Sequence, residues 1–219
     1  MKIFLDSASS KELERFLKWG IIDGVTTNQK IFLKEKGVDF KGRILELCKL
    51  AGNKPVSVES NGNKLDELLD DARRFSSIAP NIVPKMPMTR DGIGLEATNI
   101  LSKEKISVNV TVMINLNQLI LATKAGATYV SIFYNRAKDA GENPFETIKQ
   151  YVKWVEKNNF PTKLIAGSIR STKDVEEVAD AGTHIVTITP EILSQMPYHP
   201  KTEETLKEFD EAWREFLDK

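Results

Sequence analysis

Lys85 is the residue whose surroundings point most directly to covalent chemistry. It ends a short, apolar, strand-like run that begins at Asn81, and Met86 and Pro87 follow it. A lysine in such a run is partly desolvated, which favours the neutral amine, and a neutral amine attacks carbonyl carbons. The alternative is a solvated surface lysine, but the residues before Lys85 offer no polar face of a helix. We therefore interpret Lys85 as a candidate Schiff-base nucleophile.

Two carboxylates, Asp6 and Glu59, stand where other strand-like segments end. Schiff-base chemistry requires groups that move protons on and off the carbinolamine and the departing alkoxide. Two acids in one pocket can differ in protonation state, so that one acts as a base and the other as an acid. Asp6 has a simpler alternative, because Ser7 and Ser9 follow it and an aspartate in such a place is often a helix N-cap.

Neutral polar side chains close further segments. Asn109 and Thr111 alternate along one run and therefore point to the same face of a strand, as do Thr26 and Asn28 along another. If that face lines a pocket, these side chains contact a water or a sugar hydroxyl. Otherwise, they satisfy each other in the core. Ser131 occupies a similar place in a later segment.

Arginine side chains follow two late segments. Arg136 comes after the sixth strand-like run, and Ser168 and Arg170 come after the seventh, just ahead of a helix. An arginine fork with a serine hydroxyl near a helix N-terminus is suited to binding a phosphate. The eighth run ends in Thr187 and Thr189, to which we assign no role.

The composition limits the remaining classes of function. Thirty-one basic side chains balance thirty-one acidic ones, which argues against a nucleic-acid or membrane partner. The single cysteine, Cys48, excludes an internal disulfide, and we interpret it as a buried thiol. His184 and His199 have no partner at ligand spacing, so we predict no metal and no cofactor. Because no segment fits a signal peptide or a membrane span, we expect a cytoplasmic protein.

These side chains need a scaffold that brings many strand ends together. Short apolar segments predict strands over residues 3–5, 24–27, 55–59, 82–85, 108–112, 129–133, 163–166 and 185–188. Amphipathic segments predict helices between them, over 9–19, from the second strand to about 51, and over 65–78, 95–101, 115–124, 145–158 and 172–182, with a short helix from 190. A last amphipathic helix is predicted over 203–216.

Eight strand-then-helix units in 219 residues predict one domain over 1–219, a parallel (β/α)8 TIM barrel with an additional C-terminal helix. The alternative is a doubly wound open sheet, which would normally carry a Gly-rich phosphate loop after an early strand. We expect the last helix to cover the barrel mouth or to reach a neighbouring subunit. Because Pro84 cannot donate to the strand ladder, we also expect a bulge there that helps to aim Lys85.

The ordered combination of short motifs resembles the transaldolase family, in particular its short members, which include the fructose-6-phosphate aldolases. The motifs are Ile3-Phe4-Leu5-Asp6, Asp23-Gly24-Val25-Thr26-Thr27-Asn28, Lys85-Met86-Pro87-Met88-Thr89, Ala125-Gly126-Ala127-Thr128-Tyr129-Val130-Ser131, Asn135-Arg136 and Gly167-Ser168-Ile169-Arg170. Each motif is weak alone, but their order is highly specific and covers essentially the whole chain.

The resemblance implies a role for each candidate residue. Lys85 would form the Schiff base with a ketose phosphate, and Asp6 would handle protons at the substrate hydroxyl. Glu59 and Thr111 would hold and activate the water that shuttles protons. Substrate-binding roles are further implied for Asn28 and Asn109 at the dihydroxyacetone unit, for Thr26 and Ser131 nearby, and for Arg136, Ser168 and Arg170 at the phosphate. The resemblance also implies a ring-like homo-oligomer, a pentamer or a decamer.

Three positions bear on the type of reaction. Glu59, Asn109 and Phe133 match the transaldolase side of the family, whereas the aldolases tend to carry glutamine and tyrosine in place of Glu59 and Phe133. Phe133 offers no extra proton relay for hydrolysis, and a transferase must protect its Schiff-base intermediate from water. The resemblance therefore implies transfer of a dihydroxyacetone unit from a ketose phosphate to an aldose phosphate.

Two other functions stay open. One is aldolase cleavage that releases dihydroxyacetone, and the other is a non-catalytic barrel that binds a sugar phosphate or a partner protein. The only support for the second is the altered Gln29-Lys30 segment. Three departures from the family pattern near the pocket rim, that segment included, bear on the identity of the sugar. These departures are Gln29-Lys30-Ile31 after Asn28, the run from Ser57 to Asn63, and Met113-Ile114-Asn115 after the fifth strand.

Overall fold

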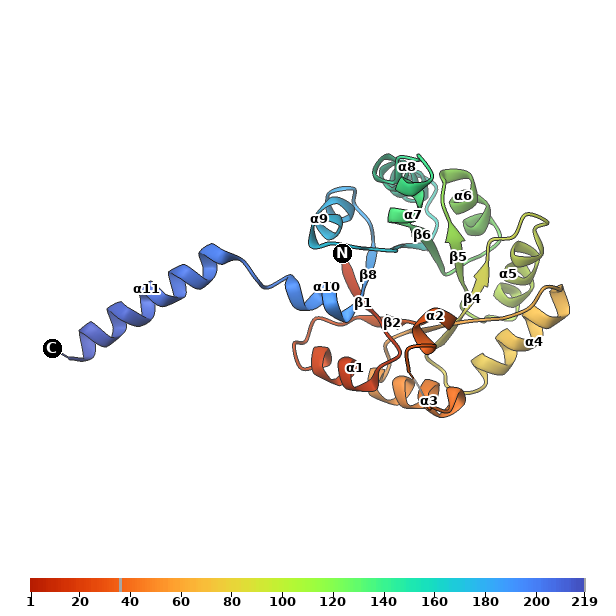
Figure 1. Ribbon diagram of the computed structural model, residues 1–219. Coiled ribbons are helices and arrows are strands. Elements are labelled where there is room, and N and C mark those ends of the chain that lie inside the picture. The colour runs from red at the N-terminus through yellow and green to blue at the C-terminus, as the bar shows by residue number, and fades with distance from the viewer. Residues whose placement is uncertain (36, 219) are drawn as a thin grey trace.

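A closed barrel of parallel strands forms the centre of the molecule (Figure 1). The computed structural model describes residues 1–35 and 37–218, and within them each of eight strands pairs with the next while the first pairs with the last. The strands are β1 (Lys2–Asp6), β2 (Gly24–Thr26), β3 (Val56–Glu59), β4 (Ile82–Pro87), β5 (Asn109–Met113), β6 (Tyr129–Phe133), β7 (Lys163–Gly167) and β8 (Ile185–Ile188). The predicted (β/α)8 barrel is confirmed, and closure of the sheet excludes the doubly wound alternative.

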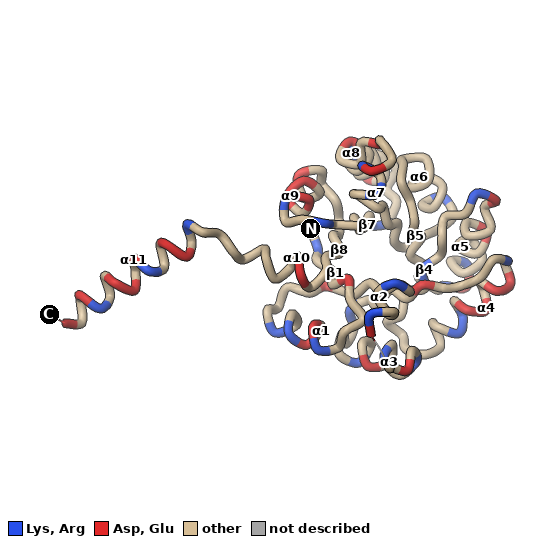
Figure 2. The backbone as a smooth tube through the Cα atoms, in the orientation of Figure 1, with Lys and Arg blue, Asp and Glu red and all other residues tan. Residues whose placement is uncertain are grey.

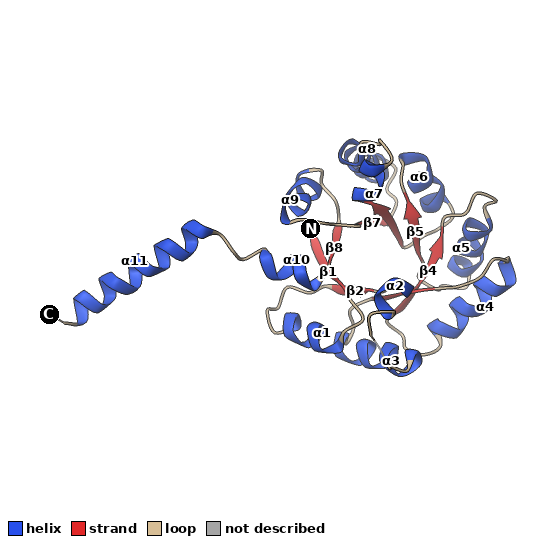
Figure 3. Ribbon diagram, viewed as in Figure 1, coloured by secondary structure: helices blue, strands red, loops and turns tan. Residues whose placement is uncertain are grey.

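Helices surround the barrel and cover the outer faces of its strands (Figure 3). They are α1 (Ser10–Leu17), α2 (Gln29–Phe32), α3 (Phe40–Ala51), α4 (Leu65–Ser76), α5 (Ile93–Lys103), α6 (Leu116–Lys124), α7 (Tyr134–Asp139), α8 (Pro144–Lys157), α9 (Thr172–Asp180), α10 (Pro190–Gln195) and α11 (Pro200–Leu217). Among the described residues, no helix combines the length and the apolar character needed to cross a membrane.

Local side-chain contacts explain where several helices begin. The Ser9 side chain accepts from the Glu12 N–H and thereby caps α1. Asn115 before α6 and Ser171 before α9 each form a complete capping box with the residue three positions on. The capping pattern in the sequence therefore placed these helix starts within a residue or two.

Two stretches differ from the expected helices. The helix expected between the second strand and residue 51 is divided into α2 and α3, and residue 36 between them lies outside the described residues. The short helix α7 was not predicted, because Phe133 at its N-cap position makes no side-chain capping hydrogen bond and the helix follows β6 without a loop. Arg136 lies on this unpredicted helix.

The bulge expected at Pro84 is wrong. The register of β4 runs without a shift against β3 from Ile82 to Lys85 and against β5 from Lys85 to Pro87. The irregularity lies in β5 instead, where the register with β6 shifts between Val110 and Met113 and Val112 has a φ of 65°. The extra residue of β5 therefore follows Thr111 directly.

The barrel interior changes from apolar to polar along the strands. Phe4, Ile165 and Ile185 pack together with Tyr129, and because these residues come from β1, β6, β7 and β8 they meet inside the barrel. Two positions further along the same strands come the residues that face the same way, namely Asp6, Ser131, Gly167 and Thr187. An apolar floor thus supports a polar layer at the C-terminal ends of the strands, and the larger apolar core lies between the strands and the helices.

The last helix, α11, projects away from the barrel (Figure 1). Within its described residues none is buried, and Leu206, Phe209, Trp213 and Phe216 are all exposed. Charges of both signs occupy the remaining positions (Figure 2). The expectation that this helix covers the mouth of its own barrel is therefore wrong.

Candidate active site

Lys85 points into the barrel rather than into solvent. Its residue is only 5% exposed, and its Nζ donates to the Thr27 carbonyl oxygen at 3.0 Å and lies 3.5 Å from Glu59 Oε2. The two side chains meet because Glu59 on β3 and Lys85 on β4 are register partners. The surface alternative for Lys85 is thus excluded, and a buried amine stands beside a partly exposed carboxylate.

Asp6 belongs to a hydrogen-bonded chain of hydroxyl groups. Thr26 Oγ1 donates to Asp6 Oδ1 at 2.7 Å, and Thr26 Oγ1 and Thr187 Oγ1 are 2.6 Å apart. Ser9, not Asp6, caps α1, so the simpler interpretation of Asp6 does not hold. Burial raises the pKa of the Asp6 carboxyl above its ordinary value, and the Thr26 hydroxyl and the Lys85 amine oppose that shift only in part.

Asn109 and Thr111 differ in how their polar atoms are satisfied. Asn109 Nδ2 donates to Ser57 Oγ at 3.2 Å, and Ser131 Oγ donates to Asn109 Oδ1 at 2.7 Å. Thr111 Oγ1 is buried and has no hydrogen-bond partner among the described residues. Because buried hydroxyls are nearly always paired, this atom marks a place for a polar group of a ligand or a water.

Asn28 stands at the mouth of the barrel, where β2 ends. Its Oδ1 accepts from the Ile31 N–H and caps the short helix α2. The next residue, Gln29, donates from Nε2 to Asn61 Oδ1 in the loop after β3. Two of the departures from the family pattern therefore touch each other, and they link α2 to the loop that follows Glu59.

The cavity among these side chains has a volume of about 100 Å³. Its walls come from seven of the strands and the loops that follow them. The lining residues are Asp6, Thr26, Asn28, Lys85, Thr111, Ser131, Phe133, Arg136, Gly167, Ser168 and Thr187. Besides Phe133, eight of the candidates identified from the sequence line the cavity, and Lys85 is one of them. Glu59 contacts Lys85, and Asn109 contacts Ser131.

Cationic and hydroxyl groups meet on one side of the cavity. The Arg136 guanidinium lies over the Phe133 ring, 4.5 Å from its centroid, and Ser168 follows β7 in a left-handed conformation with φ 59°. An arginine with a serine hydroxyl can hold a phosphate at this point. Arg136, Ser168 and Lys85 line the same cavity.

Arg170 is held elsewhere. Both ends of its guanidinium pair with the Asp139 carboxylate, with Nη1 donating to Oδ1 at 2.9 Å, and the side chain is about half exposed. Arg170 does not line the cavity in this structure. Of the three phosphate candidates, the structure therefore brings Arg136 and Ser168 together and keeps Arg170 on the outer surface.

One cavity residue, Thr187, and one residue beside the cavity, Ser57, were undervalued or missed from the sequence. Thr187 completes the hydroxyl chain to Asp6, and Ser57 fixes the Asn109 amide. Both could have been found from alternation, because Thr187 lies two residues after buried Ile185 and Ser57 two residues before Glu59.

The remaining candidates lie away from the cavity. Cys48 is buried and burial raises its pKa to about 11, which confirms the structural interpretation of this thiol. His184 Nδ1 accepts from the Leu164 N–H at the opposite end of the barrel. Over residues 1–35 and 37–218, no group of three or more His, Cys, Asp or Glu side chains is arranged to hold a metal ion.

Comparisons with known proteins agree with this geometry. The family model described as Transaldolase/Fructose-6-phosphate aldolase matches residues 3–219. A "Probable transaldolase" of Streptococcus pyogenes serotype M2 (strain MGAS10270) is 41% identical over 216 residues, which are 99% of each chain, and the protein of that name from serotype M5 (strain Manfredo) is equally similar. Among solved structures, a mandelate oxidase variant with 2-hydroxy-phenylacetamide matches with a TM-score of 0.60 at 13% identity, covering 88% of this chain and 66% of the oxidase. At that identity, the match to the oxidase supports the barrel fold alone.

Proposed function

Because the chain belongs to the transaldolase/fructose-6-phosphate aldolase family, we propose that it transfers a dihydroxyacetone unit from a ketose phosphate to an aldose phosphate through a Schiff base on Lys85. The observation that carries this proposal is the buried Lys85 amine, 3.5 Å from the Glu59 carboxylate, in one cavity with Asp6 and the unpartnered Thr111 hydroxyl. A lysine buried in this way is better suited to act as a nucleophile than to act as a solvated surface charge.

Each proton in the proposed reaction has a group to carry it. The Lys85 amine adds to the ketose carbonyl, and loss of water from the carbinolamine gives the Schiff base, with Glu59 and a water on Thr111 moving the protons. Asp6 takes the proton of the C4 hydroxyl as the C3–C4 bond breaks and the aldose leaves. The electron pair of that bond stays on C3 and is delocalised into the Schiff base as an enamine. C3 then attacks the acceptor aldehyde while Asp6 returns the proton to the new hydroxyl group, and hydrolysis of the Schiff base by water releases the product ketose and the Lys85 amine. The raised pKa of Asp6 suits a group that must both take and return a proton.

The rest of the cavity supports binding of a phosphorylated sugar. In this proposal Asn28, Asn109, Thr26 and Ser131 hold the dihydroxyacetone unit, and Arg136 and Ser168 hold the phosphate. Phe133 carries no hydroxyl, so it adds no proton donor beside the intermediate. Arg170 would reach the phosphate only after leaving Asp139.

We further propose that α11 joins copies of this chain into a ring-like homo-oligomer. Leu206, Phe209, Trp213 and Phe216 recur at helical spacing on one side of α11, and Trp213 is 60% exposed. A single-sided apolar row on a helix that leaves its own barrel is suited to a second copy. The cytoplasm stays the expected compartment.

Trapping with borohydride tests the chemistry. With fructose 6-phosphate and borohydride, the wild type should acquire a covalent adduct measurable by mass spectrometry, because reduction makes the Schiff base permanent. Lys85→Ala should acquire none, whereas Lys103→Ala, at the exposed end of α5, should react as the wild type does. Absence of an adduct with every ketose phosphate tried would refute the Schiff-base proposal.

The same mixture without borohydride separates transfer from cleavage. A transferase without an acceptor should release about one equivalent of glyceraldehyde 3-phosphate per site and then stop, because its intermediate resists hydrolysis. Repeated release of dihydroxyacetone would instead identify an aldolase. Binding of fructose 6-phosphate with neither adduct nor turnover would identify a non-catalytic barrel.

A further inference from the structure

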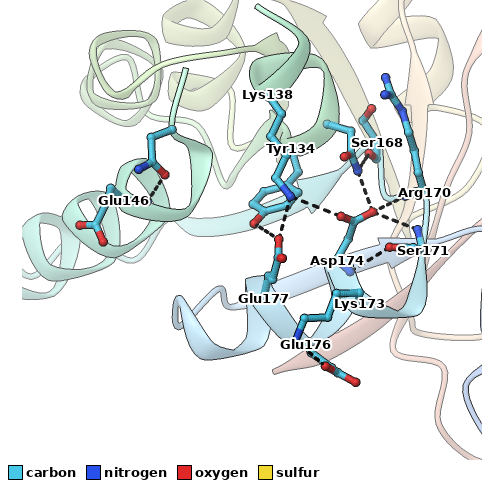
Figure 4. A network of polar contacts seen from close by, with 12 residues as sticks. Tyr134, Lys138, Glu146, Ser168, Arg170, Ser171, Lys173, Asp174, Glu176 and Glu177 are labelled. Atoms are coloured by element: carbon cyan, nitrogen blue, oxygen red, sulfur yellow. Dashed lines mark hydrogen bonds and ion pairs between the residues drawn. The ribbon is translucent and has the colours of Figure 1, made fainter. Parts of the chain in front are cut away.

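Asp174 lies behind the proposed phosphate site and connects the two segments that form it. Its Oδ2 accepts three N–H groups, from Arg170 N at 2.9 Å, from Ser171 N at 2.9 Å and from Asn135 Nδ2 at 2.8 Å (Figure 4). Asn135 is on α7 beside Arg136, whereas Arg170 and Ser171 follow Ser168. One carboxylate oxygen, on a residue that is only 6% exposed, therefore joins α7 to the loop between β7 and α9.

Asn135 extends this connection to Ser168. Its Nδ2 also donates to the Ser168 carbonyl oxygen at 2.9 Å. Ser168 has a φ of 59°, a left-handed conformation that is strained for a non-glycine residue. Such a conformation persists only where the surroundings impose it, and here the Asn135–Asp174 pair contacts the carbonyl of that very residue.

The charges around Asp174 keep its carboxylate ionised. Burial alone would raise the pKa of Asp174, but the Arg170 N–H, the Asn135 amide, the Ser171 side chain and the Lys138 amine lower it below its ordinary value. Lys138 Nζ lies 3.5 Å from Asp174 Oδ1 and 2.7 Å from Glu177 Oε2. An ionised Asp174 accepts its three hydrogen bonds more strongly than a neutral group would.

We propose that Asp174 is a positioning residue for the phosphate group of the substrate, acting through Asn135 on Arg136 and Ser168. This inference rests on the proposed function for the identity of the ligand, but its geometry stands on the hydrogen bonds alone. Asp174 does not line the cavity, so it does not touch the sugar. A purely structural role, as the third residue of the α9 capping box, would stabilise the helix without favouring phosphorylated ligands.

Asp174→Asn tests this role in the full-length protein with two probes. Inorganic phosphate, titrated by calorimetry, reports on the phosphate site alone, and dihydroxyacetone, trapped by borohydride, reports on Lys85 without a phosphate. We expect the variant to bind phosphate about tenfold more weakly and to show a KM for fructose 6-phosphate raised by a similar factor, because a charge-assisted hydrogen bond is lost. The trapping rate with dihydroxyacetone and the kcat should stay within about twofold, because Asp174 does not line the cavity that holds Lys85.

Two further variants separate positioning from folding. Asn135→Ala leaves the α9 capping box intact but breaks the link to Ser168, so it should weaken phosphate binding in the same way. Asp23→Asn removes a carboxylate that accepts the Ile3 N–H at the other end of the barrel, and it should leave both probes unchanged. The proposal is overturned if wild type binds no phosphate, or if Asp174→Asn and Asn135→Ala affect both probes equally or neither. Phosphate binding that depends on Asp174 while no ketone is ever trapped would refute the proposed enzyme but keep the positioning role.

Discussion

Two buried aspartates show how the number of N–H donors decides the charge of a carboxyl group. Asp174 receives three N–H groups, and its pKa is lowered. Asp6 receives one hydroxyl, from Thr26, and its pKa is raised by burial. The Asp174 carboxylate is held as a fixed charge, whereas the Asp6 carboxyl keeps its proton to a higher pH than an ordinary aspartate does. That difference matches a supporting role for Asp174 and a chemical role for Asp6.

The raised pKa of Asp6 predicts a pH-dependent gain in stability for Asp6→Asn. A carboxyl whose pKa is raised on folding contributes stability that is fully present below about pH 4, its unfolded pKa, and that is lost as the pH rises through the folded value. The wild type therefore loses this contribution as the pH rises above about 4, whereas the neutral amide of the variant has no such pH dependence.

Thermal unfolding of both proteins between pH 3 and pH 8 measures this effect. Asp6→Asn should melt at a higher temperature than the wild type at pH 7, and the two curves should converge near pH 3. Asp174→Asn should have the opposite effect on stability. It should melt at a lower temperature than the wild type at pH 7, and this difference should also disappear in acid. A variant at Asp6 that is less stable than the wild type at neutral pH would contradict the electrostatic description of the site.

The residues of the cavity were readable from the sequence because each ends a short apolar strand. Lys85, Asp6 and Thr111 all follow this pattern, and a barrel brings every such strand end to one place. The strand-end pattern does not identify Asp174, because in the sequence this residue is an ordinary member of a helix-capping motif. Its contact with Asn135 joins positions 39 apart and exists only in three dimensions. The pairing of Arg170 with Asp139 was equally invisible, since nothing in the sequence ranks one acidic partner above another.

At the scale of single elements, β5 carries the backbone irregularity next to the chemistry. Val112 has a φ of 65°, which is costly for a β-branched residue, and it lies directly after Thr111. Its side chain is 38% exposed, so apolar packing does not explain the conformation. The shift in register turns Thr111 and Met113 to positions that a regular strand would not give them.

The strain at Val112 predicts an unusual order of stability for two variants. In a regular strand, alanine is more stable than glycine, because glycine loses more conformational freedom on folding. At Val112 the order should reverse, and Val112→Gly should exceed Val112→Ala in the free energy of unfolding by about 1 kcal/mol, because only alanine retains a Cβ.

Denaturant unfolding of the two proteins provides the comparison, and neither variant removes a buried side chain. The reverse order, with alanine the more stable, would mean that Val112 does not hold a left-handed conformation in solution. The wild-type valine serves as a second reference, because it shares the Cβ of alanine and adds a branched side chain.

Elements with explicit caps were predictable, and those without caps were not. The starts of α6 and α9 follow from Asn115 and Ser171, whereas α7 begins directly after the last residue of β6 and has no side-chain capping hydrogen bond. The division of the expected second helix into α2 and α3 depends on Asn28 and Asp39, which each cap a helix of their own. Both caps were present in the sequence, but the continuous apolar pattern outweighed them.

For the whole molecule, the apolar side of α11 is notable because none of the described residues of this helix is buried. Most apolar side chains of the barrel are buried, whereas Leu206, Phe209 and Trp213 are exposed on α11, the helix that projects away from the barrel (Figure 1). The sequence predicted this helix and two possible locations for it, over the mouth of its own barrel or against a neighbouring subunit. The structure excludes the first. The choice between solvent and a second copy depends on chains beyond this one, which no pattern within a single sequence encodes.

The double variant Phe209→Glu, Trp213→Glu tests that choice. If α11 binds a second copy, two charges on its apolar side should produce smaller particles in sedimentation velocity, because burying an unpaired charge at an interface is costly. Lys207→Glu changes the net charge by the same amount on the opposite side of α11 and should leave the particle size unchanged. A wild type that sediments as a monomer would remove the proposed oligomer altogether.

The bond between Thr26 and Thr187 joins positions 161 apart and links the second strand to the eighth. A chain still being synthesised therefore contains Lys85, Glu59 and Asp6 long before the Thr187 hydroxyl can join the Thr26 hydroxyl that donates to Asp6. The hydrogen-bonded chain of Asp6, Thr26 and Thr187 is complete only after β8 has paired with β1. Catalytic competence should consequently arrive last in biogenesis, making enzyme activity a sensitive reporter of ring closure, and fragments that end before β8 should stay inert however well their earlier strands are folded.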